Sequence, residues 1–574
     1  MNIQLGSKRE PAYDFRSMLE NSAAAYGEKE YLVYKRGGGL ESLSYAGFEE
    51  RVRALSEAFF DLGIAGGSVA VVGETSPEWI ITYLATIITG GVIVPLDKEL
   101  SVDAIAGFVK KVGCSCVVYS KKCAVFFENK AEYPTVDYFV QFDPEKEPSK
   151  VDQKPEKGEV DFVEMLNFGR RRIDEGSEKY ESAAVDMEKV CAILFTSGTT
   201  GSSKGVMLCQ KNIIHAINGS YRRTGFESDD VVVSVLPIHH TYEMTCGILT
   251  PLYIGATVCI NDSLKYIVRN FQLFKPTGLV LVPLFVTTVY KKIWETARKG
   301  GKEKLLRGSM AVSGALRKVK IDPRKLLFKE VQKVFGGRLE RIICGGAPMP
   351  ADLVADFEAF GIKLCQGYGI TECAPLISVC PEKNNKAGSV GPAIPGVKVK
   401  IDVEEEEDGK LIGEILVNGP NVMKGYFMDD EATADVLNGS WFRTGDYGYL
   451  DEDGYIFITG RKKNVIVLNN GKNVFPEEIE EYLSKIELVK ECVVIGRTSE
   501  DGTVVVTALI FPDMPRAVEM GMEDDINVVG AAIKEEIAKL NRTLPSFKQI
   551  RGIEMRRTEF EKNTSKKIIR YTIK

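Results

Sequence analysis

The sequence predicts an α/β fold with a large amino-terminal domain of layered sheets and helices and a smaller α+β domain at the carboxyl end. Apolar strand-like segments alternate with amphipathic helical ones over residues 40–125 and again over 231–360, which is typical of parallel sheets covered by helices. From about Val397 the pattern changes to short strands separated by Gly and Asp turns, as expected for a small β-barrel-like subdomain. A chain of 574 residues is also too long for a single hydrophobic core.

The spacing of apolar residues places the individual elements of the larger domain. The expected strands cover residues 68–73, 92–96, 116–119, 190–195, 206–209, 231–236, 278–282 and 342–344. The expected helices cover residues 46–61, 77–89, 101–112, 162–175, 265–274, 285–300, 325–335 and 353–360. The charged segment 143–188 is expected to be irregular and exposed apart from its one helix.

The carboxyl-terminal region is expected to fold as a separate α+β domain. Strands over residues 413–417 and 454–458 are predicted for the barrel-like subdomain that precedes it. Within the carboxyl-terminal domain, strands are predicted over 465–468, 491–497 and 504–511, and helices over 476–485 and 528–540. We expect residues 1–461 to form the amino-terminal domain and 462–574 to form the small carboxyl-terminal one.

Composition and charge exclude several classes of protein. The 74 Lys and Arg residues against 80 Asp and Glu give a net charge of −6, which does not indicate a nucleic-acid binder. The last 34 residues are locally basic, with ten Lys and Arg against three Glu, and this surface suits an anionic substrate or carrier. Twelve scattered Cys and three His form no metal-binding pattern. Without a signal peptide or a membrane-spanning segment, we expect a cytoplasmic protein, and peripheral contact with a membrane stays open.

The most informative motif is a Gly- and hydroxyl-rich loop between two apolar strands. It runs Thr196-Ser197-Gly198-Thr199-Thr200-Gly201-Ser-Ser-Lys204. Backbone N–H groups and one lysine in such a loop suit a triphosphate. The loop is not a Walker motif, because the Gly-Lys-Ser/Thr spacing is absent and a strand follows it. The alternative is a polar hairpin turn.

Two further loops follow predicted strands at the edge where open α/β sheets bind ligands. The first is Gly345-Gly346-Ala347-Pro348. The second is Gln366-Gly367-Tyr368-Gly369-Ile-Thr371-Glu372, in which flanking glycines let a flat ligand approach the tyrosine ring. It is not a dinucleotide fingerprint, because Glu372 occupies the place of the third glycine. Alone, it is equally compatible with a loop around a buried tyrosine.

Two charged residues bracket the strand-rich stretch. Asp446, in Trp441-Phe-Arg-Thr-Gly-Asp446, is suited to accept two ribose hydroxyls. Arg461, in Gly460-Arg-Lys-Lys-Asn464, is suited to donate to the same sugar or to a phosphate. Each taken alone is compatible with an ordinary surface charge.

In order and spacing these motifs resemble those of the adenylate-forming superfamily, which includes acyl-CoA synthetases, peptide-synthetase adenylation domains and luciferases. The resemblance extends from Leu43-Ser-Tyr to Lys567. Within residues 307–350, it is specifically to long-chain fatty acyl-CoA synthetases. It implies ATP and Mg²⁺ as cofactors and CoA as a co-substrate. Thr196 and Glu372 are the magnesium ligands that it implies.

The resemblance also assigns roles around the nucleotide. Tyr368 stacks on adenine and Thr371 contacts the α-phosphate. Asp446 binds the ribose with help from Arg461, and Ile458 packs beside it. His240, in Leu236-Pro-Ile-His-His240-Thr-Tyr-Glu243, aligns with the acyl-site motif.

Three further roles fall in the carboxyl-terminal domain. Lys567 aligns with the adenylation lysine, although Lys566 replaces the usual glycine and either lysine can be the one that reaches ATP. Lys463 occupies the hinge about which this domain rotates between half-reactions, and Gly471 lines the pantetheine path. Ser203 and Asn464 also depart from the family pattern, where Pro and Asp are common.

The function implied is that of an ATP-dependent fatty acid–CoA ligase, with acyl-AMP as the intermediate. The alternatives are an acyl–acyl carrier protein ligase, an aryl-acid or luciferase-like ligase, and a non-catalytic nucleotide-binding member of the fold. Acid chain length and oligomeric state stay open.

Overall fold

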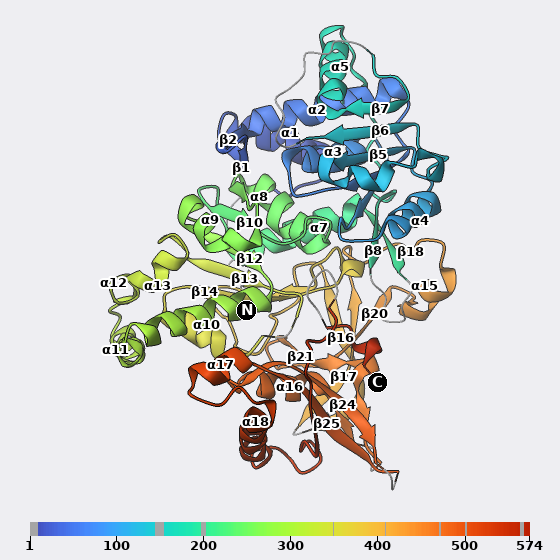
Figure 1. The fold of residues 1–574 in the computed structure, drawn as a ribbon. Coiled ribbons are helices and arrows are strands. Elements are labelled where there is room, and N and C mark those ends of the chain that lie inside the picture. The colour runs from blue at the N-terminus through green and yellow to red at the C-terminus, as the bar shows by residue number, and fades with distance from the viewer. Residues whose placement is uncertain are drawn as a thin grey trace. The chain divides into compact units, whose positions relative to one another are not determined.

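The computed structural model describes residues 10–143, 154–196, 203–347, 349–407, 409–469, 472–499, 502–562 and 568–573. The chain divides into two compact units (Figure 1). Unit 1 comprises Met1–Ala347, Ala351–Lys398 and Asn418–Phe442, and unit 2 comprises Pro348–Pro350, Val399–Val417 and Arg443–Lys574. Helices and sheets occur in both units, which confirms the predicted α/β class. The expected domain boundary at residue 461 stays a prediction.

Unit 1 contains two eight-stranded sheets whose inner strands are mainly parallel. In spatial order, the strands of the first are β18 (Gly425–Tyr426), β9 (Lys204–Cys209), β8 (Val190–Thr196), β4 (Val92–Leu96), β3 (Ser68–Val72), β5 (Cys116–Ser120), β6 (Tyr138–Phe142) and β7 (Gly158–Asp161). Those of the second are β15 (Ser378–Val379), β14 (Lys363–Tyr368), β13 (Arg341–Cys344), β12 (Gly278–Leu281), β10 (Val231–Ser234), β11 (Thr257–Ile260), β1 (Glu30–Arg36) and β2 (Gly39–Ser44).

Local sequence signals explain where the helices of the first sheet begin and end. The Ser44 hydroxyl accepts a hydrogen bond from the backbone of Gly47 at the start of α2 (Tyr45–Leu62), and Gly63 ends that helix with φ of 74°. In the same way, α4 (Val102–Val112) begins after Ser101 and ends at Gly113, where φ is 70°. Ser76 caps α3 (Pro77–Ile88), and a proline follows the cap. The predicted strand–helix alternation over residues 40–125 is therefore confirmed.

Some elements differ from the sequence expectation. The helix expected over residues 325–335 is divided into α12 (Arg324–Leu327) and α13 (Lys329–Val334), because the chain turns at Phe328 and buries its ring. Strand β7 lies within the segment expected to be irregular. The prediction also missed α7 (Gln210–Thr224), the π-helix η3 (Tyr242–Leu249) and α11 (Glu303–Lys318).

Unit 2 contains antiparallel strands and a small helix-covered sheet. Strands β16 (Lys398–Glu407), β17 (Lys410–Asn418), β20 (Trp441–Leu450) and β21 (Ile456–Arg461) lie side by side in that order. A second sheet contains β24 (Val489–Thr498), β25 (Val504–Pro512) and β26 (Gly552–Met555), with α16 (Pro476–Ser484) and α18 (Ile526–Asn541) packed on an apolar core. Over the described ranges of both units, no helix has the length and apolar character needed to cross a membrane.

Candidate active site

The two ends of the predicted phosphate loop lie opposite each other on adjacent strands. Strands β8 and β9 are antiparallel, and Thr196 is paired with Lys204. The Thr196 hydroxyl donates a hydrogen bond of 3.4 Å to the Lys204 carbonyl oxygen. Ser197, Gly198, Thr199, Thr200 and Gly201 fall outside the described residues. The sheet thus fixes the hydroxyl and the ammonium group that flank the loop.

Tyr426 connects this hairpin to the second predicted loop. Strand β18 pairs with β9, and the Lys204 ammonium group lies 4.7 Å from the centroid of the Tyr426 ring. The Tyr426 hydroxyl donates a 2.9 Å hydrogen bond to Oε1 of Glu372. The backbone N–H of Met423 donates to the Glu372 carbonyl oxygen at 2.8 Å. One cation, one ring and one carboxylate from three segments therefore form a continuous row.

The loop that carries Tyr368 is shaped by close backbone contacts. Tyr368 ends β14 with its side chain buried, and its carbonyl oxygen accepts a 2.9 Å hydrogen bond from the backbone of Ile377. A Cβ atom at Gly369 would lie 1.6 Å from the Pro375 carbonyl oxygen, so no side chain fits there. Thr371 and Glu372 follow in a single 3₁₀ turn.

The Gly345–Gly346 turn lies against the same strand end. A Cβ at Gly345 would lie 3.2 Å from the Gly367 carbonyl oxygen and 3.3 Å from the Tyr242 hydroxyl. Gly346 has φ of 86°, a conformation that favours glycine. Gln366 is buried on β14, Ala347 is exposed, and Pro348 falls outside the described residues. Both predicted loops thus meet at the carboxyl edge of the sheet.

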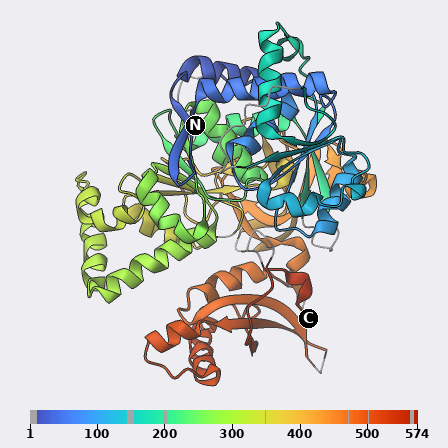
Figure 2. The same ribbon diagram turned by 45° about the horizontal axis from the view of Figure 1, so that its top comes forward.

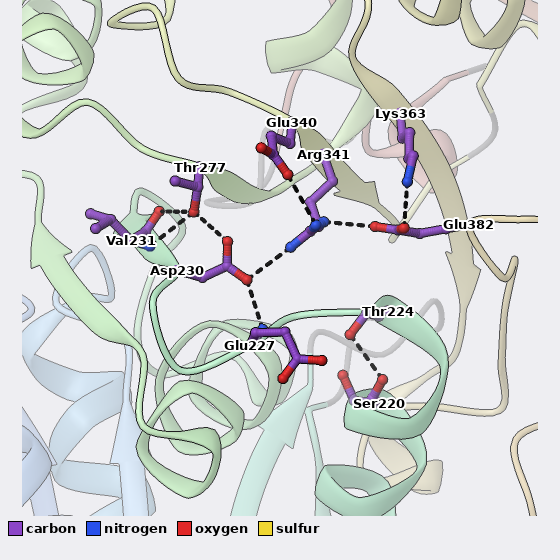
Figure 3. A network of polar contacts seen from close by, with 10 residues as sticks. All are labelled: Ser220, Thr224, Glu227, Asp230, Val231, Thr277, Glu340, Arg341, Lys363 and Glu382. Atoms are coloured by element: carbon purple, nitrogen blue, oxygen red, sulfur yellow. Dashed lines mark hydrogen bonds and ion pairs between the residues drawn. The ribbon is translucent and has the colours of Figure 1, made fainter. Parts of the chain in front are cut away.

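The opposite ends of the same strands are joined by a partly buried ion cluster (Figure 3). Arg341, the first residue of β13, contacts Oδ2 of Asp230 at 2.8 Å and Oε1 of Glu382 at 2.7 Å. Lys363, the first residue of β14, contacts Oε2 of Glu382 at 2.6 Å. Because each buried charge has a partner, the cluster fixes the strands whose other ends carry the predicted site.

The predicted acyl-site motif leads into the π-helix η3. The His239 and His240 rings lie 4.1 Å apart, and Nε2 of His239 is 3.5 Å from Oδ2 of Asp97. Burial lowers the pKa of His239, and Asp97 partly opposes the shift. Burial raises the pKa of Glu243 to about 8, although the Ser234 hydroxyl donates to its Oε1. At neutral pH the Glu243 carboxyl is therefore mainly protonated.

In unit 2, the predicted ribose-binding residues are paired across two strands. Asp446 on β20 lies opposite Arg461 on β21, and Nε of Arg461 is 2.7 Å from Oδ1 of Asp446. Asp446 is buried and Ile458 is half-buried on β21. The two predicted residues thus form one polar unit.

The predicted hinge residue lies among charged groups. Burial lowers the pKa of Lys463 to about 8, and Arg461 and Arg570 lower it further, whereas Asp446 and Glu477 oppose the shift. The amide of Asn464 donates a 2.6 Å hydrogen bond to Oε1 of Glu477. Gly471 falls outside the described residues.

Lys567 and Lys566 also fall outside the described residues, but the flanking chain is held firmly. Lys562 and Ile568 form an antiparallel bridge, and the Ile569 N–H donates to the Glu561 carbonyl oxygen at 2.8 Å. The Arg570 guanidinium is paired with the Glu480 carboxylate of α16. The Lys562 ammonium is paired with Glu491 of β24.

Sequence reasoning missed three residues that organise these regions: Tyr426, Glu243 and Glu480. Nothing in the sequence around Tyr426 indicates that its strand pairs with β9, because the two segments are far apart in the chain. Glu243 stood within the quoted acyl-site motif, and its burial was the missing information. Glu480 lies 90 residues before its partner Arg570, so no local pattern indicates this pair.

Comparison with known proteins agrees with this architecture. Residues 19–427 match the AMP-binding enzyme family, and residues 463–573 match the AMP-binding enzyme C-terminal domain. The chain is 27% identical to the long-chain-fatty-acid–CoA ligase FadD15 of Mycobacterium bovis, with 88% of this chain and 83% of the relative covered. It is also 27% identical to the long-chain-fatty-acid–[acyl-carrier-protein] ligase AEE15, chloroplastic, of Arabidopsis thaliana, with 90% and 79% covered.

Solved structures share the fold over nearly the whole chain. ATP-bound MatB from Rhodopseudomonas palustris superposes with a TM-score of 0.73 at 25% identity, covering 98% of each chain. The anthranilate CoA ligase AuaEII with anthranoyl-AMP gives a TM-score of 0.76 at 18% identity, covering 98% and 97%. The fold is therefore that of ligases that form adenylates. The chain belongs to the AMP-binding enzyme family, close to the long-chain acyl-CoA synthetases.

Proposed function

We propose that the protein is an ATP-dependent fatty acid–CoA ligase acting on a medium- or long-chain acid. In the first half-reaction, a carboxylate oxygen of the acid bonds to the α-phosphorus of ATP, and the bond to pyrophosphate breaks. In the second, the CoA thiolate bonds to the acyl carbonyl carbon and AMP leaves. The products are acyl-CoA, AMP and pyrophosphate.

The row Lys204–Tyr426–Glu372 carries this proposal. It brings the phosphate-loop hairpin and the predicted adenine-binding loop to one place in unit 1, with 4.7 Å between cation and ring and 2.9 Å between hydroxyl and carboxylate. Attack of one anion on another requires that negative charge be neutralised. A fixed cation next to the loop, with a carboxylate for a metal ion, supplies the arrangement that this step needs.

The side chains present suit Mg²⁺. The Thr196 hydroxyl and the Glu372 carboxylate are hard oxygen donors, and Oε2 of Glu372 is not the atom bonded to Tyr426. Mg²⁺ is commonly held by one or two carboxylates together with substrate phosphates. In the described parts of the chain, no three His, Cys, Asp or Glu side chains cluster as a metal cage. Bound there, Mg²⁺ would neutralise phosphate charge, while Lys204 and the loop N–H groups orient the phosphates.

Further roles follow the resemblance: Tyr368 stacks on adenine, Thr371 contacts the α-phosphate, and Asp446 with Arg461 and Ile458 binds the ribose. His240, whose ring lies 4.1 Å from that of His239, is assigned to the acyl side. Lys463 is the hinge, Gly471 lines the pantetheine path and Lys567 stabilises the adenylation transition state.

The acid is proposed from the names of the relatives, which are long-chain fatty acid ligases at 26–29% identity. Pyrophosphate release measured across saturated acids from short to long chains, with benzoate and anthranilate as controls, tests this proposal. We expect the highest kcat/KM for a fatty acid of medium or long chain. A preference for the aryl acids would reject the substrate class, and no release with any acid would favour a non-catalytic nucleotide-binding protein.

A carrier protein is the second candidate acceptor. The relative AEE15 is named as an acyl-carrier-protein ligase, and the last 34 residues of this chain carry a net charge of +7. Acidic carrier proteins and the CoA phosphates both suit such a region. Supplying preformed acyl-AMP with either CoA or holo-carrier protein, and measuring thioester formation, separates the two acceptors.

A further inference from the structure

The region from α10 (Pro283–Lys299) to α13 has a charge unlike that of the rest of the chain. Residues 291–338 contain 15 Lys and Arg against four Asp and Glu, a net charge of +11. The whole chain has a net charge of −6, so the remainder has a net charge of −17. This basic surplus is therefore a local property of one part of unit 1.

The same region exposes large apolar side chains. Six of the 22 exposed large hydrophobic residues of the described chain lie within 23 residues of each other. They are Leu305, Val312, Val319, Ile321, Leu326 and Leu327. Leu326 is 81% exposed, more than any other large apolar residue of the described ranges. Such clustering marks an interaction surface rather than scattered exposure.

Helix α11 is mainly exposed to solvent, and its inner face is mostly only half-buried. Ser313 is its single buried residue, although the helix is 16 residues long. Leu305 and Val312 are seven residues apart, so they lie on one face two turns from each other. Figures 1 and 2 show α11 at an edge of unit 1, away from its two sheets. In Figure 2 it belongs to the yellow-green group of helices.

From the last residue of α11 onward, basic and apolar residues alternate. It runs Lys318-Val319-Lys320-Ile321, and all four residues are exposed. Arg317 and Arg324 both bind Glu358 of α14 (Ala351–Ala359), which attaches this segment to the body of unit 1. The lysines and the apolar side chains therefore extend outward from a fixed base.

We propose that this surface, from α11 to α12, binds the headgroup region of an anionic phospholipid bilayer. Its lysines complement lipid phosphates, and its apolar side chains enter the acyl boundary. Long lysine side chains next to apolar residues suit this interface, because their stems lie in the apolar layer while their ammonium groups reach the headgroups. Charge complementarity singles out an anionic partner, and the exposed Leu and Ile side chains single out a bilayer. The proposal depends on the proposed function in one respect only: fatty acids, the proposed substrates, partition into membranes.

Co-sedimentation with vesicles tests the proposal without measuring ligase activity. The full chain is mixed with phosphatidylcholine vesicles with or without phosphatidylserine, at about 0.1 M and about 0.5 M salt. We expect binding to the anionic vesicles, weakened by salt. A lysine near an anionic surface contributes about fivefold to partitioning. The Lys318→Glu/Lys320→Glu variant should therefore bind at least about 25-fold more weakly.

Matched variants separate the contribution of the lysine charges from that of the apolar side chains. Lys398→Glu/Lys534→Glu changes two exposed lysines elsewhere and should bind like the wild type. Ile321→Ser/Leu326→Ser should lose the binding that survives high salt, whereas Val518→Ser/Met520→Ser, which changes two exposed apolar residues of unit 2, should not. Far-ultraviolet circular dichroism and the melting temperature should be the same in all these variants, which shows that each is folded.

A probe locates the contact directly. Fluorescence of a Leu326→Trp variant should be quenched by brominated phospholipids, and that of Val518→Trp should not. Absence of wild-type binding to anionic vesicles, equal binding by the charge-reversal and control variants, or unquenched Leu326→Trp would each overturn the proposal. Self-association abolished by Lys318→Glu/Lys320→Glu, without lipid binding, would assign the surface to a second copy instead. None of these results depends on which acid the enzyme activates.

Discussion

The two units position their predicted functional residues by different means. In unit 1, Lys204, Tyr426 and Glu372 lie on strands or directly after them, so backbone ladders set their spacing. In unit 2, the chain on either side of Lys567 is held by side-chain ion pairs, Arg570 with Glu480 and Lys562 with Glu491. Strand ladders tolerate the loss of one side chain, whereas an ion pair loses its function with either partner. Substitutions in unit 1 should therefore change mainly the rate of the chemical step. Substitutions beside Lys567 should also change the position of this lysine.

The largest effect is expected for Lys567→Ala. At roughly 4 Å and an effective dielectric of about 20, one ammonium group contributes about 4 kcal/mol to a developing negative charge. Acid-dependent pyrophosphate release should fall about a thousandfold. Thiol attack on supplied acyl-AMP should continue at the wild-type rate.

Lys566→Ala is the matched control for that variant and should remain active. If Lys566→Ala shows the large loss instead, the alignment is shifted by one residue. Equal loss of both half-reactions in Lys567→Ala would remove this lysine from its proposed role.

Glu372→Gln should have the next largest effect. It removes a metal-binding charge while keeping the shape that accepts the Tyr426 hydrogen bond. We expect adenylation to fall about a hundredfold and the Mg²⁺ concentration for half-maximal rate to rise. Tyr426→Phe, which removes one hydrogen bond of 2.9 Å, should cost only about tenfold. An unchanged Mg²⁺ requirement in Glu372→Gln would contradict metal binding at this carboxylate.

Arg570→Gln tests the ion pair beside Lys567. It leaves the Glu480 carboxylate buried without its partner, and we expect adenylation to fall about tenfold while thioester formation from acyl-AMP stays unchanged. Arg570→Lys should restore part of the adenylation rate. A purely structural role would reduce both half-reactions together and would lower the melting temperature in proportion.

The buried Glu243 predicts an effect on stability and on its pH dependence. Its pKa is raised by burial to about 8, above the usual value of 4.5. The folded state therefore binds more protons than the unfolded state between these values, and wild-type stability falls as pH rises from about 5 to about 8. Glu243→Gln imitates the protonated carboxyl, so it should nearly match the wild type at pH 5 and exceed it by about 4 kcal/mol at pH 9. Denaturant unfolding at both pH values measures this difference; equal stability at pH 9 would contradict it.

Sequence reasoning was most successful where local chemistry decides. Ser44, Ser76 and Ser101 cap helices that the pattern placed correctly, and Gly369 stands where a Cβ atom would collide with Pro375. These features need only a few adjacent residues. The positions of the loops at strand ends could therefore be predicted, and their ligand-binding role stays a prediction.

Contacts between distant segments could not be predicted. Tyr426 reaches Glu372 across 54 residues and Arg570 reaches Glu480 across 90, and no local pattern reports such pairs. Helix α11 was missed for a related reason: only Ser313 is buried, and the apolar residues on the same face are few and half-buried, so the helical pattern is weak. The exposure of its apolar residues weakened the helical pattern, and the same exposure identifies the surface proposed to bind a bilayer.

The transfer of isotope from the acid to AMP tests the central claim most directly. A fatty acid labelled with ¹⁸O in both carboxyl oxygens is incubated with the enzyme, ATP, Mg²⁺ and CoA, and the AMP is analysed by mass spectrometry. Attack of the carboxylate on the α-phosphorus predicts one ¹⁸O atom in each AMP formed. Label found in inorganic phosphate, with AMP unlabelled, would show that the acid attacks elsewhere and would contradict this account.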